Sequence, residues 1–414
     1  MNPHDLIDLA PALRLLLLAL VLALLPLSWV WLRQRGADTR TRLAALTALT
    51  LFLTFDLIVF GAFTRLSDSG LGCPDWPGCY GEMSPFAARA DIDAAQASAS
   101  GGPVTWGKAW IEMIHRYLAM TVGVLILVIA AVSWRERFGD RRRDRKPIHD
   151  CDSGHDRLPL SPWWPTAALL WVMVQGAFGK YTVTLKLYPA VVTAHLLGGL
   201  LLLALLALQH AAFQAPLAAA DPPLPQRLRA LALAAMAALV VQIALGGWVS
   251  TNYAVLACTG FPTCNGQWRP QTDFAAGFTP LRELGRAAHG GVLQFDALVA
   301  IHMAHRLFAV VATALLATLS WKLWRSAGAA PRRFGAALGW LLFAQLASGL
   351  SNVVLGWPLV AALAHAAGAA ALVLTMVLLL ALGRAGQVGS VEPLPTGTPA
   401  TRALAAGGRP ERAA

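Results

Sequence analysis

Long apolar runs dominate this sequence and limit what it can fold into. Nine segments almost free of charged side chains lie at residues 11–32, 44–63, 109–133, 163–179, 190–213, 229–250, 299–321, 334–353 and 357–383. A helix needs about 20 apolar residues to cross the hydrocarbon core of a bilayer. Because 57% of the 414 residues are hydrophobic and only 13% are charged, we predict an all-α polytopic membrane protein embedded in lipid.

Basic residues mark alternate loops between these segments. Eighteen Lys and Arg occupy the first, third, fifth and seventh loops, at positions 33, 35, 40, 42, 135, 137, 141, 142, 143, 145, 146, 157, 227, 229, 322, 325, 332 and 333. The other loops hold fewer than half as many. The positive-inside rule therefore places the N-terminus outside and the C-terminus in the cytoplasm. The net charge of +11 reports topology, and no nucleic-acid partner is expected.

The chain ends carry two further expectations. Asp5 and Asp8 precede the first apolar run without any Lys or Arg, which favours an uncleaved transmembrane helix over a signal peptide. Without an Arg-rich amphipathic leader, a bacterial inner membrane is the expected location. Residues 384–414 are rich in Gly, Pro, Ala and Thr, and we predict a disordered cytoplasmic tail.

The two halves of the chain repeat at fixed offsets. GAFTRLSDSGLGCPDWPGCYG at 61–81 aligns with GGWVSTNYAVLACTGFPTCNG at 246–266, EMIHRYLA at 112–119 with HMAHRLFA at 302–309, and Gln175 and His195 with Gln345 and His365. Each repeat has four spans, so both should enter the bilayer in the same direction, related by a pseudo-twofold axis along the membrane normal. We divide the chain into an extra N-terminal transmembrane helix with a basic loop (1–43), an N-terminal four-helix repeat (44–213), a cytoplasmic linker (214–228), a C-terminal four-helix repeat (229–383) and the tail (384–414).

Four histidines lie inside apolar spans at matched positions of the two repeats: His115, His195, His305 and His365. Ionisable residues are costly in the membrane and usually face a partner or a cofactor. All four fall on the order of 10 Å below the outer surface. Two imidazoles at one depth in a four-helix bundle can bind an iron porphyrin from both faces. Zinc fits less well, because it prefers clustered ligands and Cys.

Arg116 and Arg306 directly follow two of these histidines. Each can reach a haem carboxylate by a forked ion pair, or extend to the membrane surface as an interfacial arginine. The sequence leaves both interpretations open.

Two cysteine pairs, Cys73 with Cys79 and Cys258 with Cys264, share one spacing in loops assigned to the oxidising side. We predict a disulfide in each pair. Each is either a structural staple or a redox-active dithiol, although the spacing is not that of thiol oxidoreductases. Cys151, in the segment HDCDSGHD, suggests metal ligation, but a solvated cytoplasmic loop is the simpler interpretation.

Glu112 precedes His115 by three residues and therefore lies on the same face of its helix. The second repeat has His302 at the equivalent position. A carboxylate in one half only is expected if one site performs proton transfer and the other holds a fixed cofactor. The alternative is an acid favoured by the helix dipole. Asp56, in the middle of its span, is a second buried-acid candidate, mainly for packing or hydrogen bonding.

Together these motifs, with VQGAFGKYTV and LAHAAGAA, resemble the haem A synthase family over about residues 44–382. The resemblance implies oxidation of the methyl group of haem O to a formyl group, for use by terminal oxidases. It implies that His115 and His195 hold the haem O substrate, that His305 and His365 hold a haem b cofactor, and that Glu112 is the functional acid. Haem O synthase and terminal oxidase assembly are the implied partners, and no electron acceptor is identified. The first helix departs from the simpler eight-helix members.

Because two histidines leave a haem iron no open position for O2, we hypothesise removal of electrons from the substrate, capture of the carbon by water, and Glu112 as base. Two alternatives use the same histidines: a di-haem b electron carrier serving quinones, and a haem-handling protein.

Overall fold

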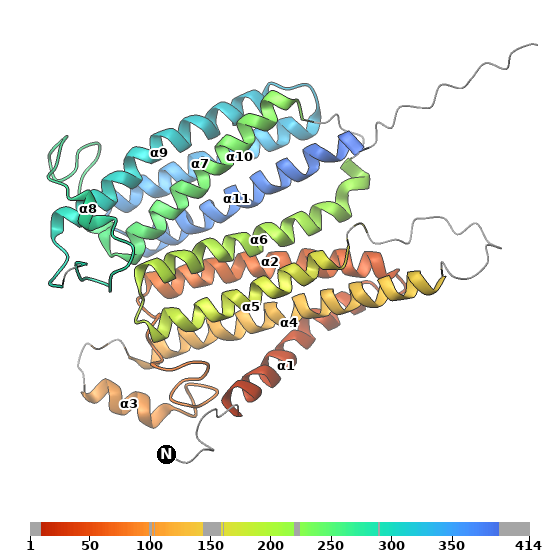
Figure 1. The fold of residues 1–414 in the computed structure, drawn as a ribbon, viewed down its shortest axis with the longest axis horizontal. Helices are drawn as coiled ribbons and strands as arrows, with labels where there is room; N and C mark the ends of the chain where they lie inside the picture. Colours follow the sequence, from red (N-terminus) through yellow and green to blue (C-terminus); the bar gives the residue numbers. More distant parts are fainter. Residues whose placement is uncertain are drawn as a thin grey trace, which may run out of the picture.

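The computed structural model describes residues 10–98, 102, 104–143, 159, 161–218, 224–288 and 290–388. Within these ranges the fold is helical, without a named strand (Figure 1). The long helices are α1 (Ala10–Arg33), α2 (Thr39–Leu66), α4 (Trp106–Arg143), α5 (Trp163–Thr184), α6 (Pro189–Ala218), α7 (Gln226–Thr251), α9 (Phe295–Trp324), α10 (Ala329–Val354) and α11 (Leu359–Val388). The short ones are α3 (Arg89–Ser98), the 3-10 helix η3 (Ala254–Leu256) and α8 (Phe274–Gly277).

All nine predicted spans form helices in the described part of the chain. Eight of them are long and apolar enough to cross a membrane. The exception is α5, where Gln175, Lys180 and Tyr181 interrupt the apolar residues. Its 22 residues would extend about 33 Å at 1.5 Å per residue, and it packs between α4 and α6. This helix therefore joins the bundle although its composition alone does not qualify it as a span.

The helices form two rings of four that share one connectivity. In the first ring α2 contacts α4, α4 contacts α5, α5 contacts α6 and α6 contacts α2; α7, α9, α10 and α11 repeat this order. The rings meet through α6 and α11, and on either side α6 contacts α7 and α2 contacts α11. If the two halves are exchanged, the α6–α7 contact becomes the α11–α2 contact, and the α6–α11 contact is unchanged. This is the pattern expected for repeats related by a twofold axis.

Helix α1 lies outside both rings and packs on α4 and α2 (Figure 1). Its buried side chains Leu15, Ala19, Ala23 and Val30 face the first ring, whereas seven of its leucines and both tryptophans are exposed. It therefore covers one face of the first ring and has no counterpart in the second.

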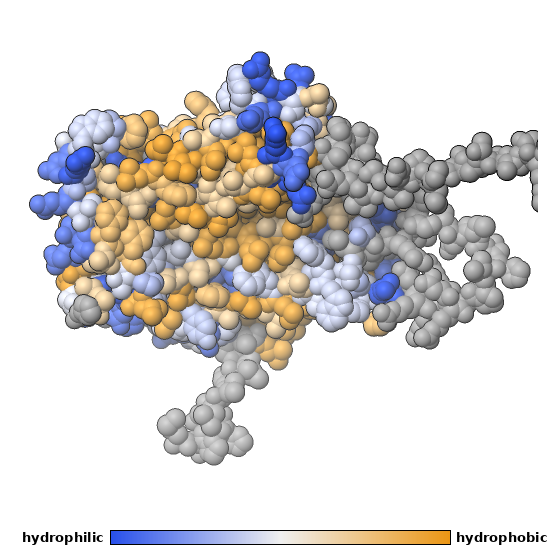
Figure 2. Space-filling model, turned by 45° about the horizontal axis from the view of Figure 1, so that its top comes forward, coloured by the Kyte–Doolittle hydropathy of each residue, from blue (hydrophilic) through white to orange (hydrophobic). Residues whose placement is uncertain are grey.

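The exterior of the molecule is that of a membrane protein. Figure 2 shows mainly hydrophobic residues over the middle of this face and hydrophilic residues towards the ends. At the end assigned to the cytoplasm, Arg33, Arg35 and Arg325 lie over the rings of Trp29, Trp31 and Trp321. Such aromatic and basic pairs are typical of the membrane interface.

Two predictions require correction. Asp56 is not buried: its side chain is exposed on α2, because it lies on the face turned away from the ring. The predicted tail boundary at 384 is also too early, because α11 continues to Val388. The rest of the tail and the segment containing Cys151 lie outside the described residues.

Candidate functional site

The four intramembrane histidines lie near the starts of α4, α6, α9 and α11, at the end of the molecule that carries α3 and α8 (Figure 1). They follow the first residues of their helices by six to ten positions, which is about 9–15 Å of helix. In each ring the two histidine helices are diagonal, since α4 and α6 are separated by α2 and α5, and α9 and α11 by α7 and α10. His115 interacts electrostatically with His195, and His305 with His365. Each ring therefore has one imidazole pair facing its interior.

Each histidine packs against a glycine of a neighbouring helix. A Cβ atom added to Gly61 would lie 2.9 Å from Nε2 of His115, and one added to Gly246 would lie 3.0 Å from Cε1 of His305. Gly179 faces His195 at 3.7 Å, and Gly349 faces His365 at 3.0 Å. These glycines are repeat equivalents, Gly61 with Gly246 at an offset of 185 and Gly179 with Gly349 at an offset of 170. The backbone beside each of the four imidazoles therefore carries no side chain. Any larger residue at Gly61, Gly246 or Gly349 would clash with the neighbouring imidazole.

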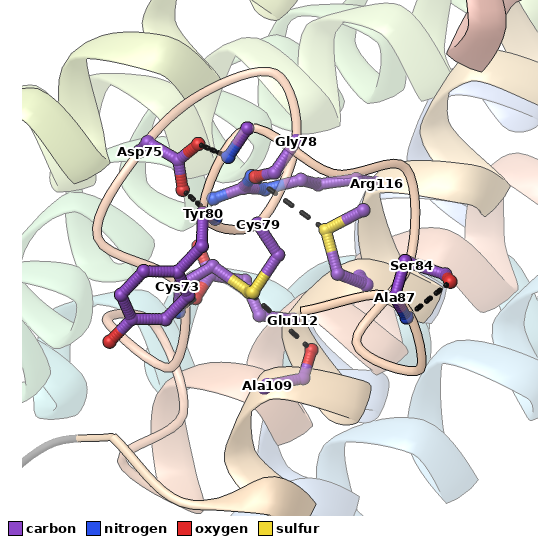
Figure 3. The surroundings of a disulfide bond; sticks show 12 residues. Cys73, Asp75, Gly78, Cys79, Tyr80, Ser84, Ala87, Ala109, Glu112 and Arg116 are labelled. Carbon is purple, nitrogen blue, oxygen red and sulfur yellow. Dashed lines mark hydrogen bonds and ion pairs between the residues drawn. A yellow bond between two sulfur atoms is a disulfide. The ribbon is translucent and has the colours of Figure 1, made fainter. Parts of the chain in front are cut away.

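A disulfide loop packs on helix α4 beside Glu112 and Arg116 (Figure 3). Cys73 and Cys79 are joined, and a short antiparallel bridge between Cys79 and Glu82 closes the turn. The Asp75 carboxylate accepts hydrogen bonds of 2.7 Å from the backbone N–H groups of Tyr80 and Gly81. Both half-cystines are fully buried. The loop is therefore held by its own carboxylate as well as by the covalent bond.

Glu112 joins this loop to helix α4. Its Oε2 atom accepts a 2.8 Å hydrogen bond from the backbone N–H of Cys73, and its Oε1 atom lies 2.5 Å from Nη2 of Arg116. Nη1 of Arg116 donates to the carbonyls of Pro77 and Gly78. Glu112 is 4% exposed and Arg116 is 9% exposed. A buried ion pair between residues on either side of His115 along the helix thus ties the disulfide loop to α4.

The second half builds the same loop with different contacts. Cys258 and Cys264 are joined, and Arg306 donates to the carbonyls of Cys258, Gly260 and Thr263. At the position of Glu112, Nδ1 of His302 makes a 2.9 Å hydrogen bond with the Ala254 carbonyl. No carboxylate takes part in the described contacts of this loop. The second half therefore reproduces the arginine contacts but lacks the buried ion pair.

A further cation lies beneath the loops of the second half. Arg282 is 3% exposed, donates from Nη2 to Oδ1 of Asn252 at 2.5 Å, and lies over the Trp248 ring. Burial lowers the pKa of its guanidinium. No periodic or repeated pattern in the sequence marks this residue.

Two contacts join the halves at the loop end. Arg65 donates from Nη2 to the Ser250 carbonyl at 2.6 Å, and the Tyr253 hydroxyl donates to Oδ1 of Asp68 at 2.6 Å. The Arg65 guanidinium also lies 4.0 Å from the centre of the Tyr253 ring. In both hydrogen bonds the partners are 185 residues apart, which is the repeat offset of this block. Each residue therefore contacts its own repeat equivalent.

Comparisons with known proteins agree with this geometry. The family model described as COX15-CtaA, cytochrome oxidase assembly protein, matches residues 44–377. The chain belongs to the haem A synthase family. A haem A synthase of Shewanella oneidensis is 38% identical over 336 residues, covering 81% of this chain and 95% of the relative. One from Methylobacterium radiotolerans is 30% identical over 392 residues, covering 91% and 98%.

Membership of the haem A synthase family implies a haem-related substrate or cofactor, and the residues present fit a porphyrin. Paired imidazoles on diagonal helices would supply two nitrogen donors to the iron of such a group. The matched glycines place no side chain on the backbone next to these imidazoles. Buried side-chain atoms without a hydrogen-bond partner include Nδ1 of His195 and the whole amide of Gln175, as expected next to a site whose polar groups are completed by a ligand.

The structure gives the two arginines a role that the sequence did not predict. Arg116 is buried and Arg306 is half-buried, and both direct their Nη atoms to backbone carbonyls of the disulfide loops. The repeat made both arginines visible, each directly after its histidine, but it did not show the direction of either side chain.

Sequence reasoning also missed the polar residues around the histidines of the second half. Nε2 of Gln242 lies 3.0 Å from Nδ1 of His305. Nδ1 of His365 lies 3.1 Å from the Gln345 carbonyl and 3.2 Å from Oγ of Ser348. The alignment of the repeats offered one signal for such residues. A polar residue in one half aligns with an apolar residue in the other, as Gln242 does with Leu57.

Proposed function

We propose that this protein oxidises haem O to haem A in a bacterial inner membrane. In this proposal the first half, residues 44–213, binds the haem O substrate through His115 and His195. The second half, residues 229–383, binds haem b through His305 and His365. Its place in the family, the two diagonal histidine pairs and their glycines support this assignment.

The observation that carries the proposal is the difference at Glu112. The halves share their histidines, glycines, disulfides and loop-binding arginines, yet only the first has a carboxylate at this site. A site that only holds a redox cofactor needs no proton acceptor, whereas oxidation of a C–H bond must release protons. The carboxylate therefore marks the first half as the place of chemistry.

The chemistry requires oxygen from water and the removal of four electrons. The porphyrin methyl and one water give the formyl group, four protons and four electrons, by way of an alcohol and a gem-diol that loses water. A haem bound in the second half supplies one-electron redox chemistry. The final electron acceptor is a partner outside this chain.

Glu112 is positioned to accept protons in this half. Oε2 accepts from the Cys73 N–H and Oε1 from Arg116, and each oxygen of a carboxylate has a second lone pair. Arg116 and the Cys73 N–H fix the carboxylate, and the buried disulfide loop limits the access of bulk water. The residue lies about 4.5 Å along the helix axis from His115.

The orientation follows from the loops. Both disulfide loops lie at the end of the molecule opposite the basic loops, and disulfides persist on the oxidising side of a bacterial membrane. We place this end outside, with the N-terminus outside and the C-terminus in the cytoplasm. Delivery of haem O and transfer of the product to a terminal oxidase assembly pathway are the expected partner functions.

The direct test is haem analysis after expression with a haem O synthase in cells that lack their own haem A synthase. We expect haem A in the extract, and haem B alone would favour a di-haem carrier. Replacing His115 with Ala should abolish haem A and leave haem b bound. Replacing His305 with Ala should remove haem b, and loss of the same pigment in both variants would contradict the assignment of the two halves.

Isotope labelling tests the source of oxygen. The alcohol intermediate should carry oxygen from labelled water, and it is the species to analyse because an aldehyde exchanges its oxygen with solvent. An alcohol oxygen derived from O2 would exclude water capture of the carbon.

A further inference from the structure

The histidines of the second half are held by hydrogen bonds that fix their rings. Nδ1 of His365 faces two acceptors, the Gln345 carbonyl and Oγ of Ser348. Nδ1 of His305 faces the Gln242 amide at 3.0 Å. The same Gln242 nitrogen donates to the His305 carbonyl at 3.2 Å and lies 3.4 Å from Nε2 of His305. Nε2 of His365 also lies 3.3 Å from the Gln345 amide nitrogen. Both rings of the second half are therefore held by polar side chains of neighbouring helices, Gln242 of α7 and Gln345 and Ser348 of α10.

The first half lacks these partners at the equivalent positions. Leu57 replaces Gln242 and Phe178 replaces Ser348. Nδ1 of His195 is buried without a partner. His115 has the Phe60 ring stacked at 6.4 Å, and no described residue hydrogen-bonds its ring nitrogens. Gln175, the equivalent of Gln345, makes no hydrogen bond through either amide atom.

Hydrogen bonds to the distal nitrogen of a metal-bound imidazole raise its basicity and fix its orientation. Loss of such a partner typically lowers metal affinity by about 10–100-fold. The two halves therefore present the same ligands with different anchoring. A substrate haem must enter and leave its site in every catalytic cycle, whereas a cofactor haem stays bound.

We infer that Gln242 and Ser348 are positioning residues that make the second half a retaining haem site, and that Leu57 and Phe178 keep the first half an exchanging one. This inference rests on the proposed function for the identity of the two haems. The anchoring difference itself concerns only residues of this chain.

The test measures haem release from the purified, haem-loaded protein to excess apomyoglobin. The unmodified protein should release haem in two phases, with haem O or its products in the fast phase and haem b in the slow phase. Combining Gln242→Leu with Ser348→Ala should accelerate the slow phase by about 10–100-fold. Ser348→Thr, which keeps the hydroxyl, should restore part of the retention.

The matched control makes the opposite substitutions in the first half. Leu57→Gln with Phe178→Ser should slow the fast phase and leave the slow phase unchanged. Electron paramagnetic resonance should show altered low-spin g values only for the haem of the modified half, a change that loosened packing alone would not confine to one site.

The outcomes separate the two hypotheses. If the Gln242 and Ser348 variants leave the slow phase and its spectrum unchanged, the anchoring inference is wrong. If the slow phase releases haem O or haem A and the fast phase haem b, anchoring stands, but the assignment of substrate and cofactor to the two halves fails.

Discussion

The two disulfide loops have the same backbone conformation but differ in the side chains that stabilise it. Both have a disulfide, an antiparallel bridge and left-handed residues at equivalent places, Tyr80 and Gly81 in one and Asn265 and Gly266 in the other. Asp75 and Glu112 hold the first loop, whereas Asn265 and His302 serve the second. The backbone geometry thus survives a change from acidic to neutral partners. The acidic partners of the first loop are therefore not needed to make such a loop, and another requirement has selected them.

The largest effect should come from Glu112. Glu112→Ala should lower haem A production by about 100–10,000-fold, because it removes the proton acceptor, while both haems remain bound. Glu112→Gln keeps an acceptor for the Cys73 N–H but removes the proton acceptor. This variant therefore separates loop anchoring from proton transfer. Retention of activity in the Gln variant would mean that the residue only holds the loop, and His302→Gln in the second half is the matched control. Haem composition measures haem A production, and absorbance spectra measure whether both haems remain bound.

The second effect concerns the arginines. Arg116→Ala leaves the Glu112 carboxylate buried without its partner and should destabilise the protein by about 3–5 kcal/mol. Arg306→Ala removes only hydrogen bonds to carbonyls, at about 1.5–3 kcal/mol. Thermal unfolding in detergent should therefore rank Arg116→Ala below Arg306→Ala. Equal losses would show that the ion pair adds nothing to the first loop.

The disulfides should contribute less. Opening a loop of this length costs about 2 kcal/mol in the chain-entropy model. Cys73→Ser with Cys79→Ser should also reduce haem A formation, since Glu112 accepts from Cys73 N–H, whereas Cys258→Ser with Cys264→Ser should act on stability alone. Activity lost equally in both pairs would instead favour redox-active dithiols.

The smallest effect is expected where the halves meet. Tyr253→Phe removes the hydrogen bond to Asp68, and both side chains are partly solvent-exposed, so the change in unfolding free energy should stay below about 1 kcal/mol. Unchanged haem content with a slightly lower melting temperature is the expected result. A large loss of haem A would show that this contact sets the geometry between the two sites.

Much of the fold was predictable because the membrane allows few solutions. Each apolar run had to form a helix that satisfies its own backbone, and the repeat offsets fixed the order of helices in the second ring from the first. The amphipathic helix α3 was missed because it lies in a polar loop. Asp56 was misplaced because hydropathy does not reveal which face of α2 meets its neighbours.

The site was predictable in its ligands and not in their surroundings. Histidines and cysteines stand out in an apolar sequence, so matched pairs are visible without a structure. The partners of His305 and His365 come from other helices, α7 and α10, and only the packing of the rings shows which residue faces which nitrogen. The direction of Arg116 depends on a loop that lies 38 residues away in sequence.

The contacts of Arg65 with Ser250 and of Asp68 with Tyr253 carry a historical consequence. A residue that touches its own repeat equivalent lies beside the twofold axis, as in the interface of a symmetric dimer. In a dimer of identical chains both members of such a contact would be the same residue. Here a tyrosine donates to an aspartate at equivalent positions, so the two halves have changed separately even beside the axis that relates them.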